Sequence, residues 1–178
     1  DSDYTINPPS FTNNGDGTIT DGNTTLMWRS QDDGSKRLWS DAKSNCTNLT
    51  LAGYSDWRLP EADELHNIVD YGKNGTAIDT SYFPSTSRQY YWSNTDVVSS
   101  TRAWLVAFEA GNVDNSEKTN SYYSRCVRGL QTSSTFTDNS NGTVRDRKTW
   151  LVWQKEDDGT ARTWEAALNY CEGLVLGG

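Results

Sequence analysis

The chain has 178 residues, a length that predicts one domain, or one domain with a fragment of another. Its formal net charge of −8 argues against nucleic acid or an anionic membrane as a partner, because phosphate binding requires clustered Lys and Arg. No run reaches the roughly 18 apolar residues of a membrane span, so we expect no membrane insertion.

The first part of the chain is predicted to contain an arm, a hairpin, a strand and a helix. Residues 1–10 read as an extended arm, and Phe11–Asp21 as a hairpin, because Asn-Gly and Asp-Gly in its turn suit positive φ. A short strand at Thr25–Ser30 and a turn at Asp32-Asp33-Gly34 follow. The helix Trp39–Leu49 would place these residues on one face: Trp39, Ala42, Cys46 and Leu49.

The clearest helix signal is Pro60–Tyr71, with Pro at the first position, acidic residues in the first turn and Gly72 after the end. The motif before it, Trp57-Arg58-Leu59-Pro60, is interpreted as structural: Trp57 and Leu59 point inward, and Arg58 needs acceptors if it is covered. Strands are expected at Tyr90–Thr95, Ala103–Glu109 and Tyr122–Arg128. Early helices and late antiparallel strands predict an α+β fold.

The end of the chain repeats its beginning at an offset of 125 residues, so that Phe11–Asp21 recurs as Phe136–Asp146. The same offset relates these pairs: Trp28 and Trp153, Trp39 and Trp164, Ala42 and Ala167, Cys46 and Cys171, Gly53 and Gly178. We therefore expect a complete domain at 11–130, a linker at 131–135 and the N-terminal third of a second copy at 136–178. That third should need other chain material to complete its core, either a complementary chain or self-association.

The three cysteines allow a pairing argument. Cys46 lies on the first predicted helix and Cys126 on the last strand of the same domain, so a disulfide between them would close a long loop. Cys171 is the repeat counterpart of Cys46, and its partner would belong to the part of the second copy that follows. The alternative is three reduced, buried thiols. A disulfide would indicate an oxidising compartment and a secreted or cell-surface protein.

The first domain resembles the Lcl C-terminal domain family. The residues that carry the resemblance run from Phe11 to Gly129: Leu26-Met27-Trp28, Leu51–Pro60, Tyr82-Phe83-Pro84, Tyr91–Thr95 and Arg125–Gly129, among others. The resemblance implies a C-type-lectin-like fold in which the first and last strands pair and a disulfide ties the first helix to the last strand, consistent with Cys46–Cys126.

The resemblance also implies a bacterial, extracellular protein used for adhesion, often in tandem repeats. The family's namesake looks like an adhesin for sulfated glycans. A net charge of −8 argues against that ligand here. The calcium–sugar motifs of true C-type lectins are absent from this sequence.

Four groups of residues are candidates for chemistry, each with a simpler alternative. The hairpin loop offers Asn14, Asp16 and Asp21 as calcium ligands, or forms only a turn. Asp32-Asp33-Gly34 and its copy offer paired carboxylates, or again turns. His66 is the only histidine and reads as a helix-surface residue. Arg58, Arg125 and Arg128 bind an anion, or Arg58 and at least one of the other two are internal pins bonded to backbone carbonyls and Asp56.

We expect a non-enzymatic binding module that needs no cofactor, with calcium as the one candidate ion. An enzyme of the related formylglycine-generating type is disfavoured, because no reactive Cys pair or nucleophile is recognisable. Binding is expected on loops after Gly72 and in the polar segments Asp96–Arg102 and Asn112–Ser121. The candidate surface for a glycan or protein ligand comprises Tyr90, Arg102, Asn112, Asp114, Tyr122 and Tyr123. The alternative is a structural subunit of a surface fibre or matrix, assembled through the incomplete second repeat.

Overall fold

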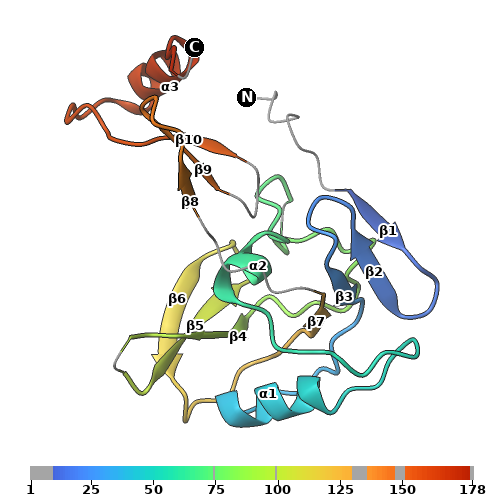
Figure 1. Ribbon diagram of the computed structural model, residues 1–178. Coiled ribbons are helices and arrows are strands. Elements are labelled where there is room, and N and C mark those ends of the chain that lie inside the picture. Colours follow the sequence, from blue (N-terminus) through green and yellow to red (C-terminus); the bar gives the residue numbers. More distant parts are fainter. Residues whose placement is uncertain (1–9, 74, 99, 130–135, 147–150, 177–178) are drawn as a thin grey trace. The chain divides into compact units, whose positions relative to one another are not determined.

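The computed structural model describes residues 10–73, 75–98, 100–129, 136–146 and 151–176. The chain divides into two compact units, with the boundary between Leu130 and Gln131. We call the described part of the first unit 1 (residues 10–129) and that of the second unit 2 (residues 136–176). The described residues form three helices and three small antiparallel sheets, so the α+β prediction is confirmed (Figure 1). The predicted arm and linker lie outside these residues, except for Ser10.

The first sheet of unit 1 joins its beginning to its end. Strands β1 (Phe11–Asn13), β2 (Thr18–Asp21), β3 (Met27–Arg29) and β7 (Val127–Arg128) pair in the order β1-β2-β3-β7. The predicted hairpin is confirmed, and Gly15 and Gly17 in its turn both have positive φ. The resemblance implied that the first and last strands pair, and this is wrong here. The last strand, β7, pairs with β3, and the β1–β2 hairpin lies on the other side of β3.

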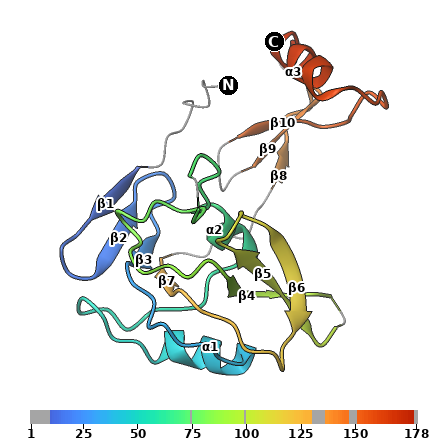
Figure 2. The ribbon, with the colours of Figure 1, turned by 180° about the vertical axis from the view of Figure 1, so that it is seen from behind.

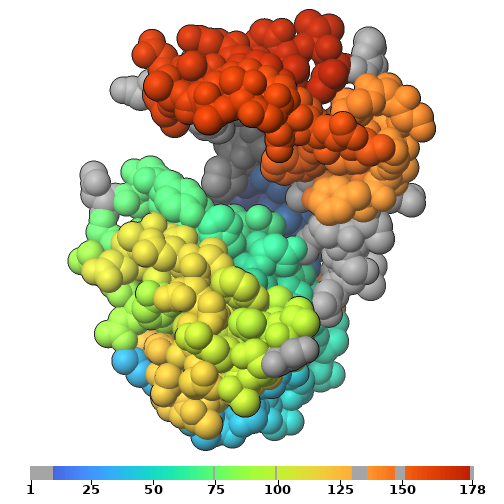
Figure 3. Space-filling model, turned by 90° about the vertical axis from the view of Figure 1, so that its left-hand side faces the viewer, coloured from blue at the N-terminus to red at the C-terminus, as the bar shows by residue number. Residues whose placement is uncertain are grey.

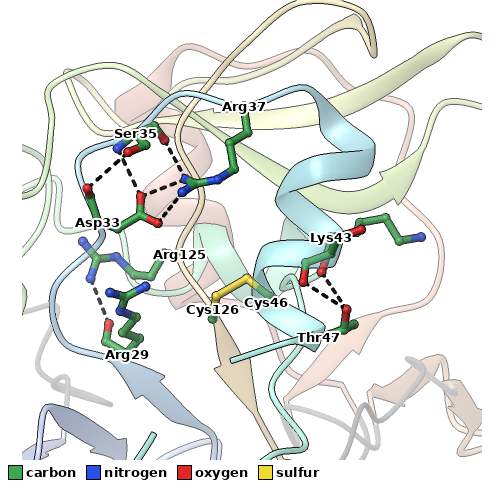
Figure 4. The surroundings of a disulfide bond; sticks show 10 residues. Arg29, Asp33, Ser35, Arg37, Lys43, Cys46, Thr47, Arg125 and Cys126 are labelled. Carbon is green, nitrogen blue, oxygen red and sulfur yellow. Dashed lines mark hydrogen bonds and ion pairs between the residues drawn. A yellow bond between two sulfur atoms is a disulfide. The ribbon is translucent and has the colours of Figure 1, made fainter. Parts of the chain in front are cut away.

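A disulfide fastens helix α1 (Trp39–Thr47) to the segment that leads into β7. Cys46 and Cys126 are bonded with their Cα atoms 5.4 Å apart, which confirms the predicted pair (Figure 4). Ala42 and Cys46 are buried on the inner face of the helix. In both ribbon views α1 runs below β4 and β7 (Figure 1, Figure 2).

The predicted helix Pro60–Tyr71 is wrong in extent, because α2 covers only Ala62–His66. Glu61 is the N-cap and forms a reciprocal capping box with Glu64, so Pro60 lies before the helix. The helix stops early because the next backbone donors turn elsewhere. The Val69 N–H bonds the His66 carbonyl, and the Asp70 N–H bonds the carbonyl of Ala77.

The second sheet of unit 1 separates two hydrophobic cores. It consists of β4 (Tyr90–Asp96), β5 (Arg102–Ala107) and β6 (Val113–Glu117) in that order. Tyr91 and Trp92 point to opposite faces, and both are buried, each in a different core. Helix α2 and the first sheet cover one face, and α1 covers the other.

Strand β6 corrects a second expectation, since Asn112–Ser121 was predicted as a polar loop. Its sequence Val-Asp-Asn-Ser-Glu lacks apolar alternation. It is nevertheless held as an edge strand by pairing along β5, from Arg102 opposite Glu117 to Val106 opposite Val113. The predicted strand Tyr122–Arg128 is mostly irregular. It makes isolated bridges at Tyr122 and Tyr123 before β7 begins.

Unit 2 has the same local structure as the start of unit 1. Its strands β8 (Phe136–Asp138), β9 (Thr143–Asp146) and β10 (Val152–Gln154) precede helix α3 (Trp164–Glu172). Trp153 is opposite Val144 just as Trp28 is opposite Ile19. Thr163 caps α3 by accepting a hydrogen bond from the Ala166 N–H.

Candidate ligand-binding surface

The motif Trp57-Arg58-Leu59-Pro60 lies inside unit 1. Trp57 and Leu59 are buried in one core. Arg58 donates two hydrogen bonds to the Glu64 carboxylate, at 2.6 and 2.8 Å, and its backbone bridges that of Val127. The Glu64 side chain is fully covered, so this bidentate pair replaces its lost hydration. The Nη1 and Nη2 atoms of Arg58 are thus used inside unit 1, whereas its Nε is buried without a hydrogen-bond partner in the described part of the chain.

Asp32 and Arg125 form a buried ion pair that the local sequence did not reveal. The Arg125 Nη2 and Asp32 Oδ2 atoms are 3.6 Å apart. Arg125 also donates to the carbonyl of Arg29, at 2.9 Å (Figure 4). A further bond from Arg125 reaches the carbonyl of Ser30, at 2.5 Å. The Tyr91 hydroxyl donates to the Asp32 carboxylate. Burial and this bond raise the pKa of Tyr91, while burial lowers the pKa of Arg125.

Arg128 is held at the surface by a second ion pair. Its Nε and Nη2 atoms donate to Asp56 at 2.7 and 3.1 Å, and its guanidinium stacks 3.7 Å from the centre of the Tyr54 ring. The hydrogen bonds from Arg128 lower the pKa of Asp56. All three candidate arginines therefore bond acceptors of unit 1: Arg58 and Arg125 in its interior, and Arg128 at its surface with Asp56.

His66 links α2 to the turn between β5 and β6. Its Nε2 lies 2.7 Å from the Tyr71 hydroxyl, which donates to the Gly111 carbonyl at 3.1 Å. Gly111 has φ of +78°, and a Cβ there would come within 2.6 Å of Tyr71. Figure 3 shows the resulting surface, where the chain after α2 (green) meets β6 (yellow).

The candidate calcium ligands are not brought together. Asp16 lies in the hairpin turn, where one of its oxygens accepts bonds from the Thr18 N–H and hydroxyl. Asp21 is at the opposite end of β2 and accepts from the Asn23 N–H and the Thr24 hydroxyl. Asn14 donates to Thr18. Among the described residues, no three His, Cys, Asp or Glu side chains are grouped as metal ligands.

The paired aspartates serve as turns in both units. In unit 1, Asp32 accepts the Gly34 N–H and Asp33 pairs with Arg37 at 2.7 Å (Figure 4). In unit 2, Asp157 accepts the Gly159 N–H in the same way. The Asp33 side chain is 24% exposed, whereas that of Asp32 is only 2% exposed and lies against Tyr91.

The six candidate ligand residues fall into separate places. Tyr122 and Tyr123 are half-buried packing residues: Tyr122 contacts Tyr90 and Trp92 edge-on, and Tyr123 stacks on Tyr91. Arg102 lies at the start of β5 and donates to the Asn115 carbonyl. Asp114 is exposed on β6, where it accepts the N–H of Asn115.

Two of these six, Tyr90 and Asn112, meet at a hollow. A pocket of about 270 Å³ lies where β4 begins and β5 ends. Its lining combines one ring with polar and charged groups: Arg88, Gln89, Tyr90, Ala107, Glu109, Ala110 and Asn112. Arg88 and Glu109 approach to 3.7 Å across the sheet end.

Sequence reasoning missed Arg88, Gln89 and Glu109. The signal lay in the strand register, because Tyr90 is opposite Ala107. Continuing an antiparallel register by two residues places Arg88 opposite Glu109, an opposite-charge pair at a strand end. Such a register can be inferred only when the correct partner strands are known.

Comparison with known proteins identifies a family. The model of the Lcl C-terminal domain matches residues 17–128, which lie within unit 1 and make up more than half of the chain. The resemblance noted in the sequence is thereby confirmed. No curated protein matches the chain. No helix within the described ranges is long and apolar enough to cross a membrane.

Proposed function

Because the chain belongs to the Lcl C-terminal domain family, we propose that unit 1 is a non-enzymatic extracellular binding module of bacteria with a C-type-lectin-like fold. The disulfide supports an oxidising compartment, since such bonds persist mainly in secreted and surface proteins. Its link from the first helix to the last strand is the feature that the resemblance implies for this fold.

The pocket beside Tyr90 is the observation that carries the proposal. It offers a half-exposed ring, the polar side chains of Gln89 and Asn112 and one charge of each sign. An aromatic face beside a few hydrogen-bonding groups suits a sugar ring, whose C–H face stacks and whose hydroxyls need donors and acceptors. Glu109 lies beside Arg88, and the chain carries −8, so the ligand we propose is a neutral glycan.

A glycan array with and without calcium tests this function. We expect binding that persists when calcium is removed, because Asn14, Asp16 and Asp21 do not converge. Arg88→Ala and Asn112→Ala should each weaken binding about tenfold, the equivalent of one hydrogen bond to a charged or polar group. An array without any signal would count heavily against a lectin function.

Arg102→Ala is the matched control. The Arg102–Glu117 pair lies at the other end of the same sheet, with the same 3.7 Å separation as Arg88–Glu109. If the ligand binds in the Tyr90 pocket, Arg102→Ala should retain the affinity of the unmodified chain. Equal losses from both substitutions would place the ligand elsewhere on unit 1.

A structural subunit of a surface fibre or matrix is the second candidate, favoured by the exposed rings of unit 2. Trp153 and Trp164 are more accessible than an independent folded unit normally allows. Molar mass at several concentrations tests it: self-association should grow with concentration, whereas a strict monomer would contradict assembly through copies of this chain.

A further inference from the structure

Strand β6 lies at the edge of its sheet in unit 1. In the described part of the chain its strand neighbour is β5, in the order β4-β5-β6 (Figure 1). An edge strand presents N–H and carbonyl groups with which another strand can pair, and a second copy of the chain carries the same edge. Val113 at the start of β6 is 45% exposed and adds an apolar side chain there. These features favour pairing between two copies.

The hydrogen bonds at the two ends of β6 show which of its backbone groups point outward. The Ala107 N–H donates to the Asn112 carbonyl at 2.8 Å. At the other end, the Lys118 N–H donates to the Thr101 carbonyl at 3.0 Å. Backbone groups of an antiparallel strand point alternately toward its neighbour and away from it. The even-numbered residues of β6 therefore bond β5, and the outward groups belong to the odd-numbered ones: Val113, Asn115 and Glu117.

The outward groups at the centre of β6 are bonded by side chains of unit 1. The Asn115 N–H donates to the Asp114 carboxylate at 2.7 Å. Arg102 of β5 donates from Nη2 to the Asn115 carbonyl at 2.9 Å. Two residues further on, the Glu117 carbonyl accepts the Asn120 N–H at 2.9 Å. Both outward groups in the middle of the strand are thus occupied, as is its last outward carbonyl.

We propose that Arg102 and Asp114 close the β6 edge against β6 of a second copy of this chain. When two copies of β6 pair antiparallel about a two-fold axis at Asn115, the two Asn115 residues exchange both of their N–H···O bonds. Those N–H and carbonyl groups are the ones that Asp114 and Arg102 hold. Pairing must therefore replace two bonds within each chain, whereas an open edge gains its bonds without such a loss.

The acidic side chains of β6 are a weaker barrier than these bonds. Asp114 and Glu117 both lie on the strand. In the antiparallel pair, Asp114 lies opposite Ser116 of the other copy and Glu117 opposite Val113, so like charges do not face each other directly. At physiological ionic strength, exposed charges more than about 8 Å apart are largely screened. The side-chain bonds to Asn115 are therefore the main obstacle to pairing.

Two double variants of the full chain separate the bonds from the charges. Arg102→Ala/Asp114→Ala removes both side-chain bonds and frees the N–H and carbonyl of Asn115. It loses one charge of each sign, so the net charge stays at −8. Arg102→Lys/Asp114→Asn is the matched control, since it keeps a donor and an acceptor at these positions but loses one negative charge. The control thus has the weaker charge repulsion and the closed edge.

Sedimentation equilibrium measures association, with the unmodified chain as the baseline. For Arg102→Ala/Asp114→Ala we expect a dimer dissociation constant about tenfold lower than that baseline, because each copy then offers a free N–H and a free carbonyl. The control variant should match the unmodified chain. Amide hydrogen exchange locates the contact: in the alanine variant, Val113 and Asn115 should exchange more slowly as the protein concentration rises.

Equal association of the alanine variant and the unmodified chain would overturn the proposal. Equal association of the alanine and control variants would do the same, because loss of the bonds would then not be the cause. Association without slower exchange in β6 would place the contact elsewhere and would also overturn it. Circular dichroism checks that each variant folds. If the double alanine variant does not, Asp114→Ala alone frees the Asn115 N–H and is judged by the same outcomes. None of these measurements depends on glycan binding at the Tyr90 pocket.

Discussion

The start of unit 1 and the whole of unit 2 are two versions of one sequence with the same local structure and different burial. Strands β1–β3 and β8–β10 share their registers, and α1 and α3 both span nine residues. Yet Trp28 is buried and Trp153 is half-exposed. Hairpin, turn and helix thus follow from short-range sequence, whereas burial depends on residues 54–129, which occur once.

The covering residues are held by contacts that are distant in sequence. The disulfide joins residues that are 80 positions apart in the sequence, and the Arg125 bonds to the end of β3 join residues 95 and 96 positions apart. Such contacts have no counterpart in unit 2. Substitutions at equivalent positions of the two units should therefore have very different effects where they remove a long-range contact. They should have similar effects where they remove a local contact.

Removal of the disulfide should give the largest difference. A Cys46→Ser/Cys126→Ser double variant is expected to lower the free energy of unfolding of unit 1 by about 4–5 kcal/mol, because the closed loop restricts the unfolded chain. Substituting both cysteines prevents either from pairing with Cys171. Cys171→Ser, the equivalent change in unit 2, should leave that free energy unchanged. Urea unfolding followed by circular dichroism measures both, and equal losses would contradict the comparison.

The equivalent tryptophans should give the next largest difference. Trp28→Ala leaves a cavity in a core and is expected to destabilise unit 1 by about 3–5 kcal/mol. Trp153→Ala removes a ring that already faces solvent, and a change within about 0.5 kcal/mol is expected. Should Trp153→Ala prove as destabilising as Trp28→Ala, the Trp153 ring must be covered in solution, and the comparison of the two units would fail.

Glu64 offers a test confined to the residues that occur once. Glu64→Ala leaves the Arg58 guanidinium without its main acceptor and removes the capping box of α2, with an expected loss of about 3 kcal/mol. Glu117→Ala, which breaks an exposed pair with Arg102, serves as the control and should change stability by less than about 1 kcal/mol. Thermal unfolding of both variants compares the two losses of stability. Similar losses would show that the buried pair contributes no more than a surface one.

The contrast between local and long-range contacts also explains which features of the fold could be predicted from the sequence. The hairpin turn followed from Asn-Gly and Asp-Gly, and the Cys46–Cys126 pair from element order. Strand β6 was missed because Val-Asp-Asn-Ser-Glu carries no apolar period and is held only by β5. The capping box that starts α2 is a local feature, whereas the end of the helix depends on a backbone hydrogen bond to the Ala77 carbonyl.

The candidate site residues show the same difference between local and long-range contacts. Asp33 pairs with Arg37 four residues away, which is visible in the sequence, whereas Asp32 meets Tyr91 across 59 residues. Nothing next to Asp32 distinguishes the two carboxylates. The pocket at Tyr90 likewise depends on the β4–β5 register, so its charged pair could not be found before the strands were matched.

The smallest effects should come from the local ion pairs that both units share. The hydrogen bond from Arg162 lowers the pKa of Asp158 to about 2, from an ordinary value of 3.8. For Asp33, burial raises the pKa, and the bonds from Arg37 and the Ser35 N–H outweigh it, so the net direction is also down. A depressed carboxyl pKa stabilises the folded state above the ordinary pKa, and this stabilisation is lost as the pH falls through the depressed value. Arg162→Ala should therefore return the pKa of Asp158 towards 3.8, and Arg37→Ala should also raise the pKa of Asp33, because burial then acts with less opposition. NMR titration of the carboxyl carbons measures both. If the pKa of Asp33 does not rise in the Arg37→Ala variant, contacts outside the shared turn must determine it.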